Sequence, residues 1–325
     1  MLDVAEILRS AERVTAFCHE NPDSDTLGAA LAIAGAAERL GKQAEVVSGD
    51  PPPPFLAFLP GIHRVRRSPA LEPDVAVVVD AGELSRIGAV TTEQADWLAR
   101  ARIVNIDHHV SNPGYGIAVW VDPEAAATCE LVTLLLRELG IPLDVELATV
   151  LMAGIVQDTH TFAHPNVTPR TLRVAAELVE AGAPLAAINR AVYADKPFST
   201  LALWGQILAG IGQRADGRIV HASMSNAMLA ATGEQPTASE GFIDVLASTR
   251  LGDITILLKE VGPDETRVSV RTSERADAVV ITAAFGGGGH ARAAGCTVRA
   301  GLDAARELVL AEAERELARG DARDH

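Results

Sequence analysis

Cysteine is scarce in this sequence, and its placement excludes several kinds of site. Only Cys18, Cys129 and Cys296 occur among 325 residues, and no two of them form a CxxC pair. So few thiols are typical of a protein from a reducing compartment, where a buried, unreacted cysteine is the ordinary outcome. We therefore expect a cytoplasmic protein with neither a disulfide framework nor a thiolate metal site.

Positive charge and long apolar runs are also scarce. The formal net charge is −15, which argues against a broad basic groove for long nucleic acid but leaves room for a small anion held by local groups. The run LGAALAIAGAA, residues 27–37, is too short to span a bilayer. Charged residues crowd the first turns, so a secretory signal is not expected either. Aromatics make up only 4% of the chain, so Ala, Val and Leu must fill the core.

What is present predicts two α/β domains. Short apolar runs at 13–18, 44–47, 74–79 and 102–106 alternate with helix-like stretches, a pattern typical of a parallel sheet covered on both faces. The pattern weakens over 191–205, and strand-like runs at 217–225, 253–261 and 266–273 precede a final helix. We expect a catalytic domain over 1–190 with a mostly parallel sheet flanked by helices, a linker over 191–205, and a smaller α/β domain over 206–325.

Acidic and imidazole side chains follow the apolar runs of the first domain. They come in four groups, at His19, Asp23 and Asp25, at Asp80, at Asp107, His108 and His109, and at Asp158. Any one of them could cap a helix or shape a turn. Strand ends of a parallel sheet share one edge, however, so the four groups can converge. Oxygen and imidazole ligands favour Mn²⁺, Mg²⁺ or Zn²⁺, and there are enough of them for two ions.

These motifs, HENPDSD, VVVD, NIDHH and GIVQD, resemble in order those of the DHH phosphoesterase superfamily, over about residues 10–190. The resemblance implies two divalent metal ions, Mn²⁺ first, with Mg²⁺ or Co²⁺ as alternatives, that activate a water for attack on phosphorus. It implies that Asp107 orients a histidine and that His109 faces the substrate phosphate. It also implies that Asp80 bridges the ions, one bound by His19, Asp23 and Asp80, the other by Asp25, Asp80, His108 and Asp158.

The second half carries the glycine run FGGGGHARAAGC, residues 285–296. No GK[ST] follows it and no strand precedes it, so it is neither a Walker loop nor a dinucleotide fingerprint. Backbone amides of Gly287, Gly288 and Gly289 could cradle an anion. His290 directly after them and Arg271, on a strand-like run, could add phosphate contacts.

This segment, with VSVRT before it, resembles the DHHA1 domain that follows the DHH domain in one branch of the superfamily. The pair resembles the bacterial oligoribonuclease and 3′-phosphoadenosine-5′-phosphate (pAp) phosphatase family, whose members include cyclic di-AMP phosphodiesterases. The resemblance implies a homodimer acting on a short oligonucleotide, pAp or a cyclic dinucleotide, without long nucleic acid or membrane. Arg292 could tune which end of a nucleotide binds. Ser24 and His160 stand where the family often has glycine or a small residue. His160 is either exposed or reaches the phosphate site, and we expect it to be exposed.

Three other functions share parts of this pattern. A manganese-dependent pyrophosphatase shares the DHH half, but its second domain lacks the GGGGH element. A long-strand exonuclease of the superfamily would need a basic, aromatic module for tracking single strands, which this chain lacks. A nucleotide sensor without catalysis is a further alternative, against which the full set of metal ligands speaks.

Overall fold

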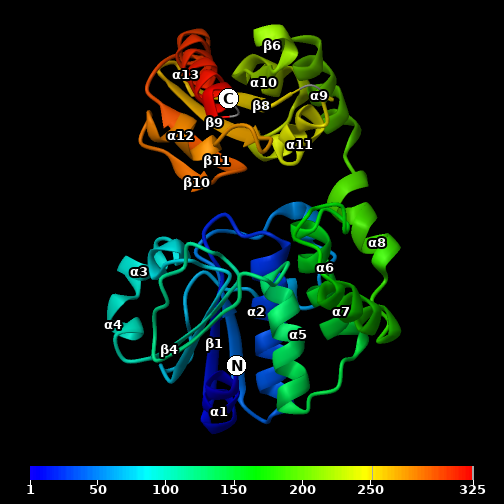
Figure 1. Ribbon diagram of the computed structural model, residues 1–325. Helices are drawn as coiled ribbons and strands as arrows, with labels where there is room; N and C mark the ends of the chain where they lie inside the picture. Colours follow the sequence, from blue (N-terminus) through cyan, green and yellow to red (C-terminus); the bar gives the residue numbers. More distant parts are fainter. Residues whose placement is uncertain (251, 324–325) are drawn as a thin grey trace. The chain divides into compact units, whose positions relative to one another are not determined.

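The computed structural model describes residues 1–250 and 252–323, which divide into two compact units (Figure 1). The first runs from Met1 to Asp195 and the second begins at Lys196. This division lies inside the segment predicted as a linker. That segment is not all connection, because helix α9, Phe198–Ala209, begins within it.

The first unit contains a five-stranded parallel sheet in the order β2-β1-β3-β4-β5. The four strands predicted from the sequence are present, and β5 is an additional short edge strand that the sequence analysis missed. The strands are β1 Arg13–Phe17, β2 Gln43–Val47, β3 Val75–Val79, β4 Arg102–Asp107 and β5 Ala118–Val121.

Helices cover both faces of this sheet, which explains why β3 is apolar at every position. Val75, Val77 and Val79 enter a core shared with α2, α5 and α6, whereas Ala76 and Val78 pack on the opposite side. Figure 1 shows α2 and α5 on one side of the sheet and α3 and α4 on the other. The α-helices of this unit are α1 Leu2–Ser10, α2 Ser24–Arg39, α3 Val90–Glu93, α4 Ala95–Leu98, α5 Thr128–Leu139, α6 Val145–Asp158, α7 Pro169–Glu180 and α8 Leu185–Asn189. Shorter helical turns are η1 Pro54–Leu56, η2 Ile62–Arg64, η3 Leu84–Ile87 and η4 Arg190–Ala194.

Two glycines allow helices α2 and α6 to cross closely beneath the sheet edge that carries the acidic motifs. A Cβ added at Gly28 would lie 2.3 Å from the Val150 carbonyl oxygen. One added at Gly154 would lie 2.5 Å from both the Asp25 Oδ1 and the Cys129 Sγ. Such distances are too short for any side chain, so the packing of these helices requires glycine at both positions.

The second unit contains a six-stranded mixed sheet in the order β10-β11-β9-β8-β7-β6, in which only the β7–β8 pair is parallel. The strands are β6 Gly212–Arg214, β7 Ile219–Met224, β8 Ile254–Gly262, β9 Glu265–Thr272, β10 Gly288–His290 and β11 Ala293–Val298. The remaining helices are α9, α10 Asn226–Thr232, α11 Phe242–Ala247, α12 Ala278–Ala283, α13 Leu302–Arg323 and the turns η5 Ala215–Gly217 and η6 Pro236–Ser239. Helices α12 and α13 pack on one face of this sheet, and α9, α10 and α11 cover part of the other.

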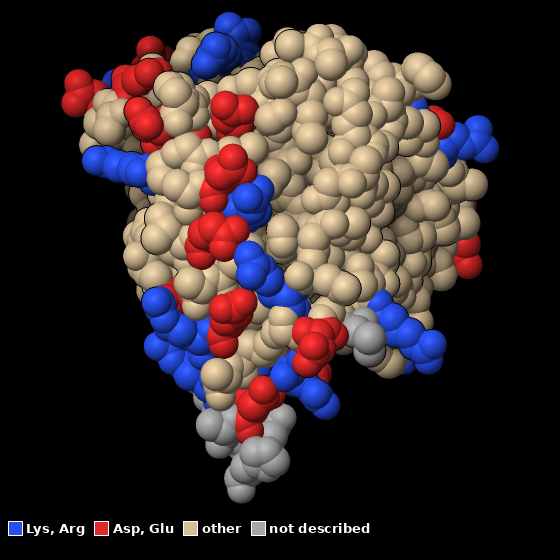
Figure 2. Space-filling model, turned by 90° about the horizontal axis from the view of Figure 1, so that it is seen from above, with Lys and Arg blue, Asp and Glu red and all other residues tan. Residues whose placement is uncertain are grey.

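The surface mixes charges of both signs. On the face drawn in Figure 2, acidic and basic side chains alternate beside a broad area that has neither. Ion pairs form along α13, such as Arg315 with Glu312 and Arg319 with Glu316. Within residues 1–250 and 252–323, the structure has no helix whose length and apolar character would let it cross a membrane.

Candidate metal centre and nucleotide site

The four sequence motifs of the first unit meet at one edge of its parallel sheet. Asp80 directly follows β3 and lies between two imidazoles. Its Oδ2 is 3.3 Å from the Nε2 of His19, and its Oδ1 is 3.5 Å from the Nε2 of His108. Asp158, at the end of α6, places its Oδ2 3.2 Å from the same His108 nitrogen. The structure thus brings together residues 139 positions apart in the chain, from His19 to Asp158.

These side chains form three groups, two of which contain Asp80. Within each of the groups His19–Asp23–Asp80, Asp25–His108–Asp158 and Asp80–His108–His109, the potential ligand atoms lie within 4.8 Å of one another. Asp80 is in contact with His19 of the first group and His108 of the second. The fold thus brings together the three residues predicted for one ion and three of the four predicted for the other, and Asp80 contacts a histidine of each set. Which of these side chains bind metal stays a prediction.

Backbone carbonyls fix the orientation of two of the imidazoles. The Nδ1 of His19 donates to the Glu20 carbonyl over 2.8 Å, and the Nδ1 of His108 donates to the Ala125 carbonyl over 3.2 Å. Since a carbonyl can only accept, the proton of each neutral ring is held on Nδ1 and Nε2 is left to face the carboxylates. This is the arrangement that a metal-binding histidine requires.

The carboxylates of the cluster favour a positive charge beside them, as the pKa values of the neighbouring histidines indicate. Burial alone would lower the pKa of His19, but the hydrogen bond to Asp80 and the charges of Asp23 and Asp80 raise that pKa to about 10. Asp158 and Asp80 likewise overcome burial and raise the pKa of His108 to about 12. Burial, reinforced by neighbouring carboxylates, holds the pKa of Asp25 well above its ordinary value.

In the absence of metal, protons bound to the histidines and to some of the aspartates reduce the repulsion between the carboxylates. Burial raises the pKa of Asp23 to about 6, although His19 beside it opposes the shift. By contrast, hydrogen bonds from His108 and His19 overcome burial and hold the pKa of Asp80 far below its usual range. A set of four carboxylates and two oriented imidazoles without thiolate fits divalent ions such as Mn²⁺ or Mg²⁺.

The start of helix α5 supports the carboxylates, a role that the sequence analysis missed. The Thr128 and Cys129 amides donate to the two oxygens of Asp25 over 2.7 and 2.8 Å. The Thr128 hydroxyl donates to Asp80 over 3.1 Å. Asp80 itself has a φ of 57°, a conformation uncommon outside glycine that the surrounding bonds hold in place. No spacing rule would have revealed these contacts, because they join residues about 50 and 100 positions apart.

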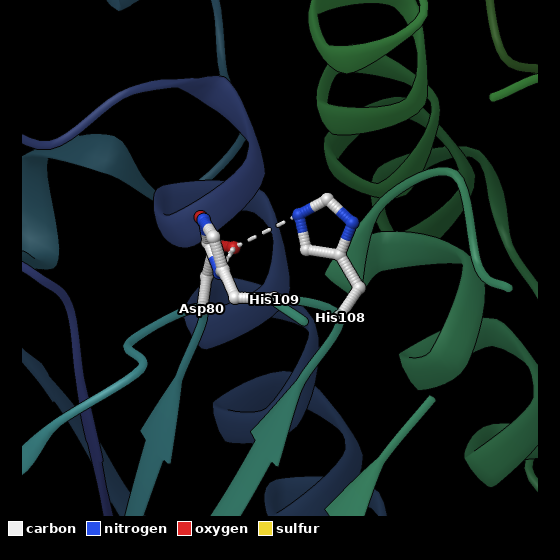
Figure 3. A group of neighbouring side chains, drawn as sticks. All are labelled: Asp80, His108 and His109. Carbon is white, nitrogen blue, oxygen red and sulfur yellow. Dashed lines mark ion pairs between the residues drawn. The ribbon is translucent and has the colours of Figure 1, made fainter. Parts of the chain in front are cut away.

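His109 has a different environment from its neighbour His108. Its Nδ1 lies 2.6 Å from the Oδ1 of buried Asp107 and 3.7 Å from the Oδ1 of Asp80. Figure 3 shows the His108 ring apart from Asp80 and joined to it by the dashed ion pair, whereas His109 overlaps Asp80 in this view. Because Nδ1 donates to Asp107, the Nε2 of His109 lies on the edge of the ring opposite that carboxylate. Asp107 therefore lies where a residue that orients a histidine would lie, as the resemblance implied.

Asp107 is held in turn by a buried polar network that the sequence analysis also missed. Asn112 donates to the Oδ2 of Asp107 over 2.6 Å and to the Asn105 side-chain oxygen over 2.8 Å. Asn105 donates to the Tyr115 hydroxyl, which donates to the Ala81 carbonyl. The signal was present in NIDHHVSNPGY, where two amides and a phenol surround the DHH motif at short spacing.

The expectation that His160 is exposed is wrong. His160 is half-buried, and its ring lies against His164 and Tyr193 with centroid distances of 5.4 and 4.6 Å. His160, Thr161 and Phe162 all have positive φ, from 47° to 64°. Left-handed backbone costs about 1–2 kcal/mol per residue outside glycine, so this turn beside Asp158 is held under strain. The ring contacts help to hold it.

In the second unit the glycine run is partly a strand rather than a loop. Residues Gly288–His290 form edge strand β10, which pairs with β11. A Cβ at Gly287 or Gly289 would collide with the β11 backbone, whereas one at Gly288 would meet nothing within 4 Å. Two glycines of the run are thus required for sheet packing, and Gly288 is exposed and sterically open.

Arg271 and His290 lie in one cross-strand row of this sheet. Ala293 pairs with both, so their side chains project from the same face. Arg271 is in an ion pair with Asp244 at 3.3 Å. The guanidinium of Arg292 instead donates to the carbonyls of Ser273 and Ala276 and closes a turn of its own unit. Its predicted contact with a nucleotide stays a prediction.

Comparisons with known proteins agree with this architecture. The N-terminal domain of the DHH family matches residues 13–155, and the DHHA1 domain matches residues 217–319. The chain is 34% identical over 320 residues to the bifunctional oligoribonuclease and PAP phosphatase NrnA of Thermus thermophilus, covering 97% of this chain and 94% of that protein. An exopolyphosphatase-related protein from Bacteroides fragilis has the same fold, with a TM-score of 0.91 at 22% identity, covering 98% and 96% of the two chains.

A relative of another kind matches only part of the chain. A protein of Exiguobacterium, named as a probable manganese-dependent inorganic pyrophosphatase, is 28% identical over 175 residues, covering 51% of this chain and 54% of that protein. The resemblance to NrnA of Thermus thermophilus instead extends through both units. The chain therefore belongs to the DHH family, in the branch with a DHHA1 domain that includes the bifunctional oligoribonuclease and PAP phosphatase NrnA.

Proposed function

We propose that this protein is a metal-dependent phosphoesterase that hydrolyses short oligoribonucleotides of two to five residues and pAp, with cyclic and linear diadenylates as further substrates. The observation that carries the proposal is the intact cluster around Asp80, in which every predicted ligand faces its group. Relatedness over both units to an oligoribonuclease and PAP phosphatase supports the substrate class.

The donor set fits two divalent ions, and the family resemblance supports Mn²⁺ in preference to Mg²⁺ or Co²⁺. His19, Asp23 and Asp80 would hold one ion, and Asp25, Asp80, His108 and Asp158 the other. When bound, such ions supply the Lewis acidity that activates a water and neutralises phosphate oxygens. The oriented rings of His19 and His108 would keep their Nε2 atoms available, and the shared carboxylate of Asp80 would hold the two positions at a fixed separation.

His109 would act on the substrate itself. Hydrogen-bonded to Asp107 at Nδ1, it keeps its Nε2 proton on the side away from that carboxylate and could donate to an oxygen of the phosphoryl group. Burial would lower the pKa of His109, but Asp107 and Asp80 raise it above its ordinary value, which favours the doubly protonated ring. A cationic donor stabilises the negative charge that develops on phosphorus oxygens in the transition state.

A substrate panel tests the proposal. The full-length protein with Mn²⁺ would be incubated separately with pAp, a linear diadenylate, cyclic di-AMP, pyrophosphate and a long single strand. The expected result is release of AMP from the first two, slower or comparable turnover of cyclic di-AMP, and little action on the last two. Hydrolysis of pyrophosphate alone would identify a pyrophosphatase. Nucleotide binding without turnover, with metal retained after dialysis, would identify a sensor.

The family resemblance further supports a cytoplasmic homodimer. Size-exclusion chromatography with light scattering would measure the oligomeric state directly. A mass of one chain at micromolar concentration would reject the dimer without affecting the proposed chemistry.

A further inference from the structure

Basic side chains gather on one face of the sheet in the second unit, and two of them, Lys259 and Arg267, have no role in the metal site or the glycine motif. Lys259 on β8 and Arg267 on β9 are direct cross-strand partners. Arg271 lies on β9 four residues after Arg267, so side-chain alternation places both on the same face. Both residues therefore project from the face that also carries His290.

Like charges directly opposite each other on neighbouring strands are destabilising. The pKa of Lys259 is consistent with this repulsion. Burial lowers that pKa, the charges of Arg267 and Arg271 lower it further, and the charge of Glu240 partly offsets them. The sequence contains only three lysines, so this pair is not the result of an abundance of that residue. A fold that places two cations together without an acid between them leaves room for an external anion.

The acidic groups nearby do not neutralise the pair. Asp244 on α11 is in an ion pair with Arg271, and Glu240 influences Lys259 from the turn before α11. Within the part of the chain that the structure describes, neither Lys259 nor Arg267 has a side-chain hydrogen bond or an ion pair. Arg267 is exposed, whereas Lys259 is half-buried.

The surface between the basic side chains is made of small residues. Ser269 and Gly295 form the cross-strand row between that of Arg271 and that of Arg267, and Gly288 continues this row onto β10. Ser269 and Gly295 are half-exposed, and Gly288 is exposed. On β9, β11 and β10 a ribose or a base can therefore lie beside the cations without meeting a large side chain, whereas Leu257, which continues this row onto β8, is buried in the core with α11.

We propose that Lys259 and Arg267 bind a second phosphate group of an oligonucleotide, beyond the phosphate that Arg271 and His290 bind. The four residues from Arg267 to Arg271 span about 14 Å of strand, further than two phosphates carried by one ribose. The pair thus serves substrates of three or more nucleotides and contributes least to pAp. This inference rests on the proposed function, because it assumes nucleotide binding by Arg271 and His290.

Steady-state kinetics on the full-length protein test the inference. In Arg267→Gln and Lys259→Gln, the ratio of the KM for a 5′-phosphorylated tetraribonucleotide to the KM for pAp should rise at least fivefold, while kcat for the tetranucleotide stays within twofold. Arg315→Gln makes the same charge change on α13, which packs on the opposite face of the sheet, and should leave the ratio unchanged. An unchanged ratio in the Arg267→Gln/Lys259→Gln double variant would overturn the inference, as would an equal rise in Arg315→Gln.

A binding measurement separates this inference from the proposed activity. Fluorescence anisotropy with a labelled tetraribonucleotide in EDTA needs no turnover. Each substitution should weaken binding at least fivefold and reduce the slope of log affinity against log salt concentration by roughly 0.7. If the protein hydrolyses no nucleotide yet shows this loss, the proposed function fails and the anion site stands. If binding is unaffected while hydrolysis is normal, the anion site fails alone.

Thermal unfolding measures whether the Arg267→Gln variant is still folded. Because Arg267 repels Lys259 in the absence of an anion, Arg267→Gln should unfold at the same temperature as the wild type or slightly higher. Adding the tetranucleotide should stabilise the wild type more than the variant. A fall in melting temperature without ligand would show that Arg267 supports the fold and would contradict the role assigned to it.

Discussion

The candidate metal centre and the proposed nucleotide-binding surface differ in how many of their contacts the chain itself supplies. In the first unit Asp80, His19 and His108 are buried or nearly so, oriented by carbonyls and by the start of α5. In the second unit His290 and Arg267 are exposed. The first site is a preformed cluster that would hold compact ions, whereas the second would be completed only by a bound ligand. Damage to the first should therefore remove catalysis, and damage to the second should weaken binding.

The largest effect is expected at Asp80, which contacts both His19 and His108. Asp80→Asn should lower kcat/KM for every substrate by a factor of about 10³ or more, because a neutral amide is a poor ligand for two cations at once. The melting temperature without metal should fall, because the Asp80 carboxylate accepts hydrogen bonds from His19 and His108 that hold its pKa far below the usual range. The fold should survive, since Asp80 lies at a strand end with a φ of 57° that asparagine tolerates. Turnover within tenfold of the wild-type rate would show that the two groups do not act as one centre.

A smaller loss is expected from Asn112, which acts through Asp107 on His109. Asn112→Ala should reduce kcat by about 10–100-fold, the range typical of residues that orient a functional histidine, with little change in KM. The double variant His109→Ala/Asn112→Ala should be no slower than His109→Ala alone. Additive losses would instead indicate that Asn112 supports the fold or acts independently.

In the second unit the expected effect falls on binding. Gly288→Ala should raise KM for pAp and dinucleotides by about tenfold while kcat and Mn²⁺ affinity hold, since a Cβ there obstructs approach to the backbone. The fold should tolerate it, because that Cβ meets nothing within 4 Å. Gly262→Ala on β8, equally open, is the matched control. If both variants retain wild-type KM, the glycine strand does not contact the substrate.

The smallest effect is on the stability of the metal-free protein. The pKa of His19 is raised from 6.5 to about 10, and that of Asp23 from 3.8 to about 6. Within each of these pH ranges the folded state therefore binds more protons than the unfolded state. Stability should therefore fall as pH rises from about 7 toward 10. Melting temperatures in EDTA should drop by several degrees over this range, and saturating Mn²⁺ should reduce the drop. A melting temperature that is flat or rising with pH would contradict the charge state assigned to the cluster.

The same contrast explains what the sequence could predict. The strands of the first unit and the ligands at their ends follow from apolar runs and motif order, because parallel strands deliver their ends to one edge. The support from Thr128, the network behind Asp107 and the half-buried position of His160 depend on packing between distant segments. The Lys259–Arg267 pair depends on cross-strand register, which a one-residue slip would reverse. Sequence pattern alone does not determine that register.

The close crossing of α2 and α6 at Gly28 and Gly154 has a consequence for how this protein can change over evolutionary time. Asp25 lies at the start of α2 and Asp158 at the end of α6, so the distance between these carboxylates depends on that crossing. A methyl group at either glycine would wedge the helices apart and shift both carboxylates together. Exposed residues of the second unit, such as Arg267, can therefore be replaced one at a time, whereas the spacing of Asp25 and Asp158 changes only when both helices change together.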